Sequence, residues 1–214
     1  MTPSFTVSIS TILLRHGETP LSGQRYSGRG DPGLTGRGRE QAAAAASRLA
    51  REPGLAAVIS SPLSRARDTA EAVAAAAGVP LCLEDDLVET DFGCFEGLTF
   101  EEAQERWRDD HTAWLDRSFT EAPPGGESVA DVARRVSRAL ARLRTEYAGE
   151  TVVLVSHVTP IKLMVCSALG VAAEDSFFRL RIDTGGLTRI DWYGADSAVV
   201  AWVNDTSHLR RTVG

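Results

Sequence analysis

The sequence predicts an α/β domain with a mostly parallel central sheet and helices on both faces. Short apolar stretches typical of strands alternate with longer helical stretches as far as Leu169. The stretch Thr151–Ser156 is almost wholly apolar, as expected of a central parallel strand that is covered on both sides. The chain of 214 residues has a globular composition without an internal repeat, so residues 1–214 are expected to form one domain.

The first half of the chain opens with a strand and a long loop. Ser8–Arg15 ends in a run of apolar residues, and the Gly/Ser/Pro-rich stretch Gly17–Gly36 after it is typical of a loop. The Ala-rich stretch Gly38–Arg51 is expected to be a helix. Next come an expected strand at Leu55–Ser60, a helix at Ser64–Ala77 that a Gly-Val-Pro sequence ends, and a short strand at Leu81–Leu83.

Helix starts are marked more clearly in the second half. After a loop at Asp85–Gly97, Thr99 with Glu102 has the spacing of a capping box. Ser128 with Asp131 opens a second helix, which is expected to run to Tyr147. Thr159 followed by proline is a typical N-cap for a helix that runs to Ala168, and Phe177–Val203 is expected to hold short strands with turns.

The composition of the chain argues against several kinds of binding partner. The formal net charge of -6 argues against a broad nucleic-acid or anionic-membrane surface. No apolar run reaches the roughly 18–20 residues that span a bilayer, and the start does not resemble a signal peptide, so a cytoplasmic protein is expected. Cys82, Cys94 and Cys166 are too scattered for a disulfide framework or a zinc site, and we expect no metal or cofactor. Cys82 and Cys166 are expected in the core. The sequence leaves open whether the chain forms a homodimer.

Basic side chains follow three of the predicted strands. Arg15 and His16 come at the end of the first strand, Arg65 opens the helix after the second, and His157 follows Thr151–Ser156. Ligands of open α/β sheets bind at the carboxyl ends of the strands, where these side chains should converge. Burying them there would be costly without an anionic partner. The sequence therefore predicts an anion site that contains two histidines.

A phosphate group fits this site best. Arginine offers a planar fork of donors to phosphate, and an imidazole nitrogen close to phosphorus can attack it in line. Glu89 is the best-placed carboxylic acid to protonate the leaving oxygen. Taken singly, each residue has a simpler interpretation: a structural histidine, a charge on a helix surface, an exposed loop acid. His111 and His208 have no such context and are expected at the surface.

Five motifs in order resemble the histidine phosphatase superfamily, which includes the cofactor-dependent phosphoglycerate mutases. They are Leu14–Thr19 (an R-H-G-E-T sequence), Leu34–Ala42, Ser60–Ala70, Glu89–Thr99, and Gly125–Ser128 together with Val155–His157. The resemblance covers roughly Thr11 to Leu169. It implies a phosphoglycerate mutase-like fold and a reaction through a phosphohistidine.

The resemblance also implies roles for single residues. His16 becomes the nucleophile, Arg15, Arg65 and His157 hold the phosphoryl group, and Glu89 becomes the general acid. Further residues are expected to line the substrate site: Gly17, Ser22, Ser27, Gly28 and Val158. Val158 stands where many relatives carry glycine, and Ser22 where many carry asparagine.

A finer resemblance connects the chain to the acid-phosphatase domain of actinobacterial bifunctional ribonuclease H/acid phosphatases, which is related to α-ribazole phosphatases. It rests on Arg15–Ser22, Arg25–Gly30 and Val155–Lys162. The implied substrate is a small phosphomonoester, with α-ribazole 5′-phosphate as first candidate, where Arg25 meets the ribose and Tyr26 stacks on the base. A loose pocket for many phosphomonoesters is the alternative.

Two other functions stay open. A mutase-type phosphotransferase would share the first half-reaction, but the segment from Glu89 to Pro123 lacks the insertion with paired arginines that such mutases use. A non-catalytic phosphate-binding module would be expected to have lost a catalytic residue, and none is missing here. Phosphatase activity is therefore the favoured prediction.

Overall fold

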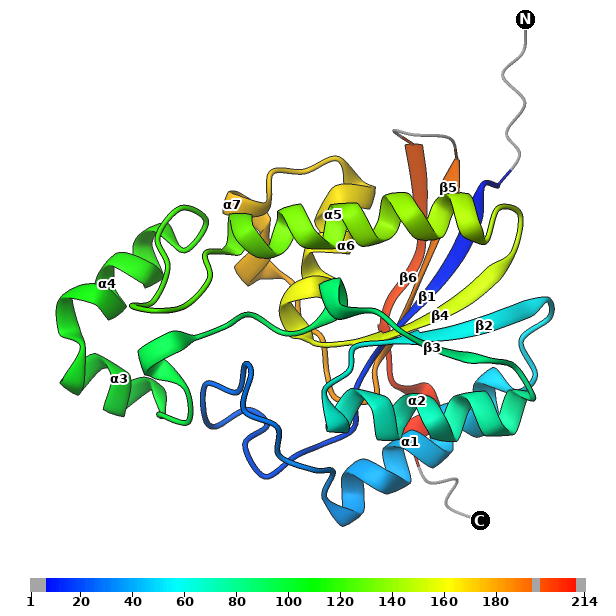
Figure 1. The fold of residues 1–214 in the computed structure, drawn as a ribbon, viewed down its shortest axis with the longest axis horizontal. Helices are drawn as coiled ribbons and strands as arrows, with labels where there is room; N and C mark the ends of the chain where they lie inside the picture. Colours follow the sequence, from blue (N-terminus) through cyan, green and yellow to red (C-terminus); the bar gives the residue numbers. More distant parts are fainter. Residues whose placement is uncertain (1–6, 194–196, 211–214) are drawn as a thin grey trace, which may run out of the picture.

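A six-stranded β-sheet forms the centre of the protein in the computed structural model, which describes residues 7–193 and 197–210 (Figure 1). The strands are Ile9–Arg15 (β1), Leu55–Ser60 (β2), Leu81–Leu83 (β3), Thr151–Ser156 (β4), Leu187–Tyr193 (β5) and Ser197–Asp205 (β6). In the order β3-β2-β4-β1-β5-β6, the first four run parallel, whereas β5 is antiparallel to β1 and β6 is antiparallel to β5. The predicted α/β class with a mostly parallel sheet is confirmed.

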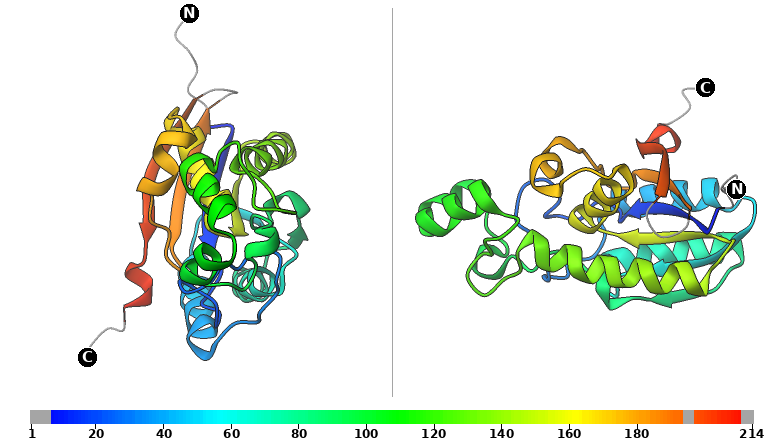
Figure 2. Two further views of the ribbon diagram at one scale, coloured as in Figure 1. Left: turned by 90° about the vertical axis from the view of Figure 1, so that its left-hand side faces the viewer. Right: turned by 90° about the horizontal axis from the view of Figure 1, so that it is seen from above.

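Helices cover both faces of this sheet. Helices α1 (Gly36–Leu49) and α2 (Ser64–Ala77) lie on one face, and α5 (Val129–Glu146) and α6 (Val158–Leu169) lie on the other (Figures 1 and 2). The central strand β4 shows why both faces must be covered. Its alternate residues, Val152 and Leu154 against Val153 and Val155, are fully buried in two separate apolar clusters.

A smaller group of elements lies beyond the carboxyl ends of β1 and β4. Helices α3 (Phe100–Arg106) and α4 (Arg108–Arg117) project from this end (Figure 2, right), and α7 (Ala173–Ser176) follows α6. In the described part of the chain, 3-10 turns lie at Asp85–Leu87, Gly93–Phe95, Phe177–Arg179 and Ser207–Leu209. A third apolar cluster, built on Tyr26, Phe95, Ala103 and Trp114, joins α3 and α4 to the loop after β1. No helix of the described residues has the length and apolarity to cross a bilayer.

Most predicted boundaries agree with the structure. β2, α2, β3 and β4 have the predicted bounds, and the helices predicted to start after Thr99 and Ser128 both begin with a capping box. Helix α1 begins two residues earlier than predicted, because the Thr35 hydroxyl accepts the Gly38 amide at 2.9 Å and so caps it. The C-terminal region holds two long strands, not the several short ones predicted. Cys166 is buried as predicted, but Cys82 is exposed because β3 is an edge strand.

Candidate active site

Two histidines lie at the ends of neighbouring parallel strands. β1 pairs with β4 so that Arg15 lies beside Ser156, and the His16 amide donates to the Ser156 carbonyl at 3.1 Å. His157 follows directly, and the centroids of the two imidazole rings are 5.0 Å apart. Arg65 comes from the first turn of α2 and reaches the His16 ring. The carboxyl edge of the sheet thus brings together the residues from which the sequence predicts an anion site.

The hydrogen bonds of His16 define the state of its ring. Nδ1 lies 2.7 Å from the Gly17 carbonyl oxygen, which can only accept, so Nδ1 carries the proton and Nε2 keeps its lone pair. Nε2 receives the Nε–H group of Arg65 at 3.3 Å. Burial, followed by the charges of Arg15 and Arg65, lowers the pKa of His16 well below its usual range. His16 is therefore a neutral imidazole whose Nε2 carries the lone pair of a nucleophile, once the long hydrogen bond from Arg65 gives way to phosphorus.

Arg65 is held by a loop that a carboxylate organises. Its guanidinium is 1% exposed and donates to the carbonyl oxygens of Gly28 at 2.7 Å and Gly30 at 2.8 Å. The Glu96 carboxylate accepts the amides of Gly28, Arg29 and Gly30 at 3.1, 2.8 and 3.4 Å. A Cβ atom on Gly28 would lie 2.1 Å from this carboxylate, so only glycine allows the contact. Glu96 therefore orients the peptide groups that position Arg65.

Three buried polar atoms near the histidines have no hydrogen-bond partner among residues 7–193 and 197–210. They are Nε of Arg15, Oγ of Ser27 and Nδ1 of His157. Arg15 is fixed by a bond from Nη1 to the Ile182 carbonyl at 2.7 Å, and His157 by one between Nε2 and the Ser61 hydroxyl at 2.8 Å. Buried groups left without partners are costly, so they mark a place where a ligand with several acceptor oxygens would be stabilised.

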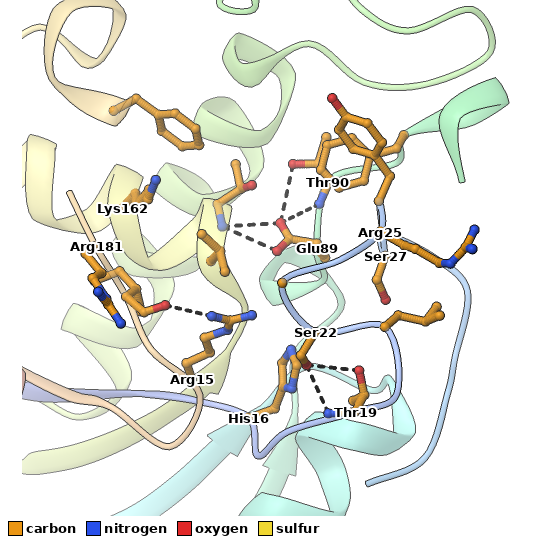
Figure 3. A pocket seen from close by; sticks show the side chains of 18 of the residues that line it. Arg15, His16, Thr19, Ser22, Arg25, Ser27, Glu89, Thr90, Lys162 and Arg181 are labelled. Atoms are coloured by element: carbon orange, nitrogen blue, oxygen red, sulfur yellow. Dashed lines mark hydrogen bonds between the residues drawn. The ribbon is translucent and has the colours of Figure 1, made fainter. Parts of the chain in front are cut away.

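The Glu89 carboxylate lies at the start of α6. It is 5% exposed, and it accepts the amide of Thr90 at 2.8 Å and that of Thr159 at 3.3 and 3.4 Å (Figure 3). Thr159 is therefore not the N-cap that the sequence predicts. The helix begins at Val158, and Glu89, distant in sequence, satisfies one of its free amides.

A partly buried ion pair holds the loop that carries Glu89. Arg135 of α5 donates to the carbonyl oxygens of Asp86, Val88 and Glu89 at 2.8, 2.6 and 2.9 Å. Its guanidinium also donates to both carboxylate oxygens of Glu127 at 3.1 Å. Glu127 accepts the Asp91 amide at 3.0 Å, which holds the other side of the loop. Hydrogen bonds from Arg135 lower the pKa of Glu127, although burial acts in the opposite direction.

A cavity of about 410 Å³ opens in front of His16 (Figure 3). Eight residues with predicted roles line it: Arg15, His16, Ser22, Arg25, Tyr26, Ser27, Glu89 and Val158. The other four are not among the lining residues: Gly17, Gly28, Arg65 and His157. Ser22 fixes the loop after His16, because its hydroxyl accepts the Thr19 amide at 2.9 Å.

The predicted use of Arg25 and Tyr26 needs correction. Tyr26 is 4% exposed, and its ring lies among aromatic rings that include Phe92 and Trp114, so it has no free face on which a base could stack. Its hydroxyl bonds to Nε2 of His111 at 2.9 Å. His111 is therefore buried, not at the surface as predicted. Arg25 lines the cavity but is turned to Glu102, which accepts from its guanidinium at 2.8 Å, so contact with a ribose would compete with this ion pair.

Several cavity residues were not predicted from the sequence. Lys162 lies one helical turn after Val158, so the helical period alone could have found it. Phe177, Leu180 and Ile182 come from the segment between α6 and β5, and their place in the wall depends on how that segment packs. No sequence pattern indicates such a contact.

A model of the histidine phosphatase superfamily (branch 1) matches residues 11–205, a range that contains every site residue described above. The chain belongs to the histidine phosphatase superfamily. This confirms the family that the motifs predict, and membership places the chain among phosphatases and phosphotransferases.

Similar proteins agree with this assignment. The bifunctional protein Rv2228c of Mycobacterium tuberculosis is 52% identical over 200 residues, which are 92% of this chain and 54% of that protein. The chain thus spans about half the length of this relative. The structure of Bacillus stearothermophilus YhfR superimposes with a TM-score of 0.86 at 28% identity, covering 94% of this chain and 100% of that one. The α-ribazole phosphatase of Shigella flexneri gives 0.82 at 28% identity, covering 92% and 96%. These superpositions confirm the phosphoglycerate mutase-like fold.

Proposed function

We propose that this histidine phosphatase hydrolyses a small phosphomonoester through a phosphohistidine on His16, without a metal ion. One observation carries the proposal: the Gly17 carbonyl keeps the ring proton of His16 on Nδ1, so Nε2 offers its lone pair beside Arg15 and Arg65. Attack of Nε2 on phosphorus forms an N–P bond and breaks the P–O bond to the leaving group.

The neighbouring residues supply charge and protons. Arg15, Arg65 and His157 would hold the phosphoryl oxygens, and the first turn of α6 adds partial positive charge. Glu89 gives a proton to the leaving oxygen and then takes one from the water that attacks the phosphohistidine. An alcohol and inorganic phosphate leave, and His16 is regenerated.

The part of the cavity wall that comes from the segment between Glu89 and Pro123 favours hydrolysis over transfer to a second phosphorylated acceptor. Between Glu89 and Pro123, the residues that line the cavity are Thr90, Phe92, Phe100 and Trp114, none of which is charged. A mutase would need cations there to hold the second anionic end of its substrate. A non-catalytic module is less consistent with a complete set of His16, Arg65, Glu89 and His157.

Two classes of substrate, which differ in their leaving groups, are consistent with the site. Similarity to an α-ribazole phosphatase supports α-ribazole 5′-phosphate, a nucleoside-like substrate with an apolar base. A mostly apolar cavity that accepts several phosphomonoesters is the alternative, and it does not need Tyr26 as a stacking platform. A comparison of kcat/KM for α-ribazole 5′-phosphate, a mononucleotide and a simple sugar phosphate separates the two classes, because a specific site should discriminate by more than about tenfold.

The central test follows the phosphoryl group. During turnover of a labelled aryl phosphate in excess chelator, we expect full activity and an acid-labile label on the peptide that contains His16. The variant His16→Ala should lose both turnover and label. Label on another residue, or activity that only added magnesium or zinc restores, would contradict the proposal.

A further inference from the structure

Among the described residues, the outer part of the cavity contains one cation that forms no salt bridge with a carboxylate. Arg25 pairs with Glu102 at 2.8 Å, and Arg181 pairs with Asp183 at 2.9 Å. Lys162 also lines the cavity, but among the described residues no carboxylate forms an ion pair with it. It is the sole lysine of the chain, whose other 22 basic residues are arginines.

Lys162 is placed away from the phosphoryl site but within the same cavity. It follows Val158 by four residues on α6, which is about 6 Å along the helix axis. Its ammonium group lies 4.6 Å from the centre of the Phe177 ring. Figure 3 shows it on the Arg15 side of the cavity, across from Arg25. Burial lowers the pKa of Lys162, the nearby charge of Glu89 opposes this shift, and the charge of Arg15 adds to it.

The cavity has an apolar wall, of which Phe177 contacts Lys162. The wall includes Leu21, Phe92, Phe100, Trp114, Phe177 and Leu180. Phe100 is 51% exposed, so part of the wall is open to a ligand. The contact with Phe177 offsets only part of the cost of burying an ammonium group, and an anionic oxygen close to Lys162 would offset more.

We propose that Lys162 and this wall form a subsite for a leaving group with an apolar, ring-containing body that carries one carboxylate. The inference rests on the proposed phosphatase activity and names its substrate class. A single ammonium group matches a single carboxylate better than a second phosphate dianion. α-Ribazole 5′-phosphate has no such group, so the subsite favours phosphorylated aromatic acids over it.

The kinetic test uses a matched pair of substrates, 2-naphthyl phosphate and its 6-carboxy derivative. We expect the wild type to prefer the acid in kcat/KM. Lys162→Met should lower kcat/KM for the acid about 10- to 100-fold, the range of a hydrogen bond to a charged group, and change the neutral substrate by less than about threefold. Lys162→Arg should keep most of the preference. Arg179→Met, a change at an exposed residue two positions after Phe177 that does not line the cavity, is the control.

A second measurement does not depend on turnover. Because the chain has one lysine, limiting acetylation followed by mass spectrometry reports on Lys162 alone, apart from the N-terminal amine. The unreactive 6-(phosphonomethyl)-2-naphthoate should protect Lys162, whereas 2-(phosphonomethyl)naphthalene and inorganic phosphate should not.

The outcomes separate the two proposals. Equal wild-type rates on both naphthyl substrates, or equal losses on both in Lys162→Met, would overturn the subsite while leaving the phosphatase intact. Turnover of neither substrate, in the presence of selective protection by the carboxylate, would instead contradict the phosphatase and keep the subsite.

Discussion

His16 and His157 are both neutral, but their partners give them opposite roles. At His16 a carbonyl oxygen holds the Nδ1 proton, so the other nitrogen is a nucleophile. At His157 the partner is the Ser61 hydroxyl, which already accepts the Leu63 amide at 3.3 Å and can therefore give its own proton to Nε2. His157 then carries its ring proton on Nδ1, the nitrogen that has no partner in the described structure. This N–H group would donate a hydrogen bond to an oxygen of the bound phosphoryl group.

Ser61→Ala tests the assignment at His157. Without the hydroxyl, the ring loses the bond that selects its tautomer, and we expect inorganic phosphate to inhibit about tenfold more weakly, close to the value of one hydrogen bond. The measurement is the inhibition constant of phosphate against an aryl phosphate substrate. An unchanged constant with reduced thermal stability would assign Ser61 a structural role only.

Glu89→Gln should affect substrates according to their leaving groups. Alkyl phosphates need a proton on the departing oxygen, whereas activated aryl phosphates do not, so we expect the loss in kcat to be about 10²- to 10⁴-fold for the former and far smaller for the latter. Asp91→Asn is the matched control, since Asp91 is in the same loop and its carboxylate accepts the Gly93 amide at 2.8 Å. Equal losses on both substrate types for Glu89→Gln would place the general acid elsewhere.

At the residue scale, the sequence identifies which polar residues form the site better than it predicts what surrounds each side chain. His16, Arg65 and His157 follow predicted strands, so the topology brings them together without further information. Tyr26 and His111 were misjudged because their environment is a cluster built from the loop after β1 and from α4, which are 85 residues apart in the chain. Packing over such distances leaves no local pattern.

Helix α5 holds the loop that carries Glu89 in place through Arg135, which donates hydrogen bonds to three carbonyl groups of that loop. We expect Arg135→Met to reproduce the defect of Glu89→Gln in weaker form: a loss on alkyl phosphates that exceeds the loss on aryl phosphates, because Glu89 is displaced. The readout is the ratio of kcat values for the two substrate types, together with the melting temperature.

Arg142→Met is the control for this change. Arg142 lies on the same helix and also binds Glu84 and Asp86, but its side chain is 51% exposed, and exposed ion pairs contribute little to stability. It should alter neither the ratio nor the melting temperature appreciably. A stability loss in Arg135→Met with an unchanged ratio would limit the ion pair to folding.

Element boundaries were predictable wherever the signal is local. The Ser128 capping box and the apolar run of β4 specify their own element, and both occur as predicted. The start of α6 was placed wrongly because its amide cap is the Glu89 carboxylate, 70 residues away from Thr159. This contact between Glu89 and the Thr159 amide, which no local sequence pattern indicates, also joins Glu89 to the helix that faces the phosphoryl site.

At the scale of the whole molecule, the negative net charge of the chain contrasts with the positive side chains gathered at the site. The chain carries a net charge of -6, yet the site gathers Arg15, Arg65 and Lys162 around neutral histidines. Local placement thus outweighs the overall charge in selecting an anionic ligand. The organisation of residues 1–214 as one domain stays a prediction, supported by a single sheet in which β4, from the second half of the chain, lies between β2 and β1 from the first.

The buried histidines should make the whole fold sensitive to mild acid. Burial is the main cause that lowers the pKa values of His16 and His157 well below the ordinary value of 6.5. The unfolded chain therefore binds more protons than the native protein below pH 6.5, and the free energy of unfolding must fall as the pH falls. Two such groups give a slope of up to about 2.7 kcal/mol per pH unit, at 1.36 for each. Urea melts at pH 7.5, 6.5, 5.8 and 5.2 measure this slope above the range where carboxylates with lowered pKa values, such as Asp131, contribute. The double variant His16→Asn/His157→Asn should lose at least half of the slope, and an unchanged slope would assign the acid sensitivity to other groups.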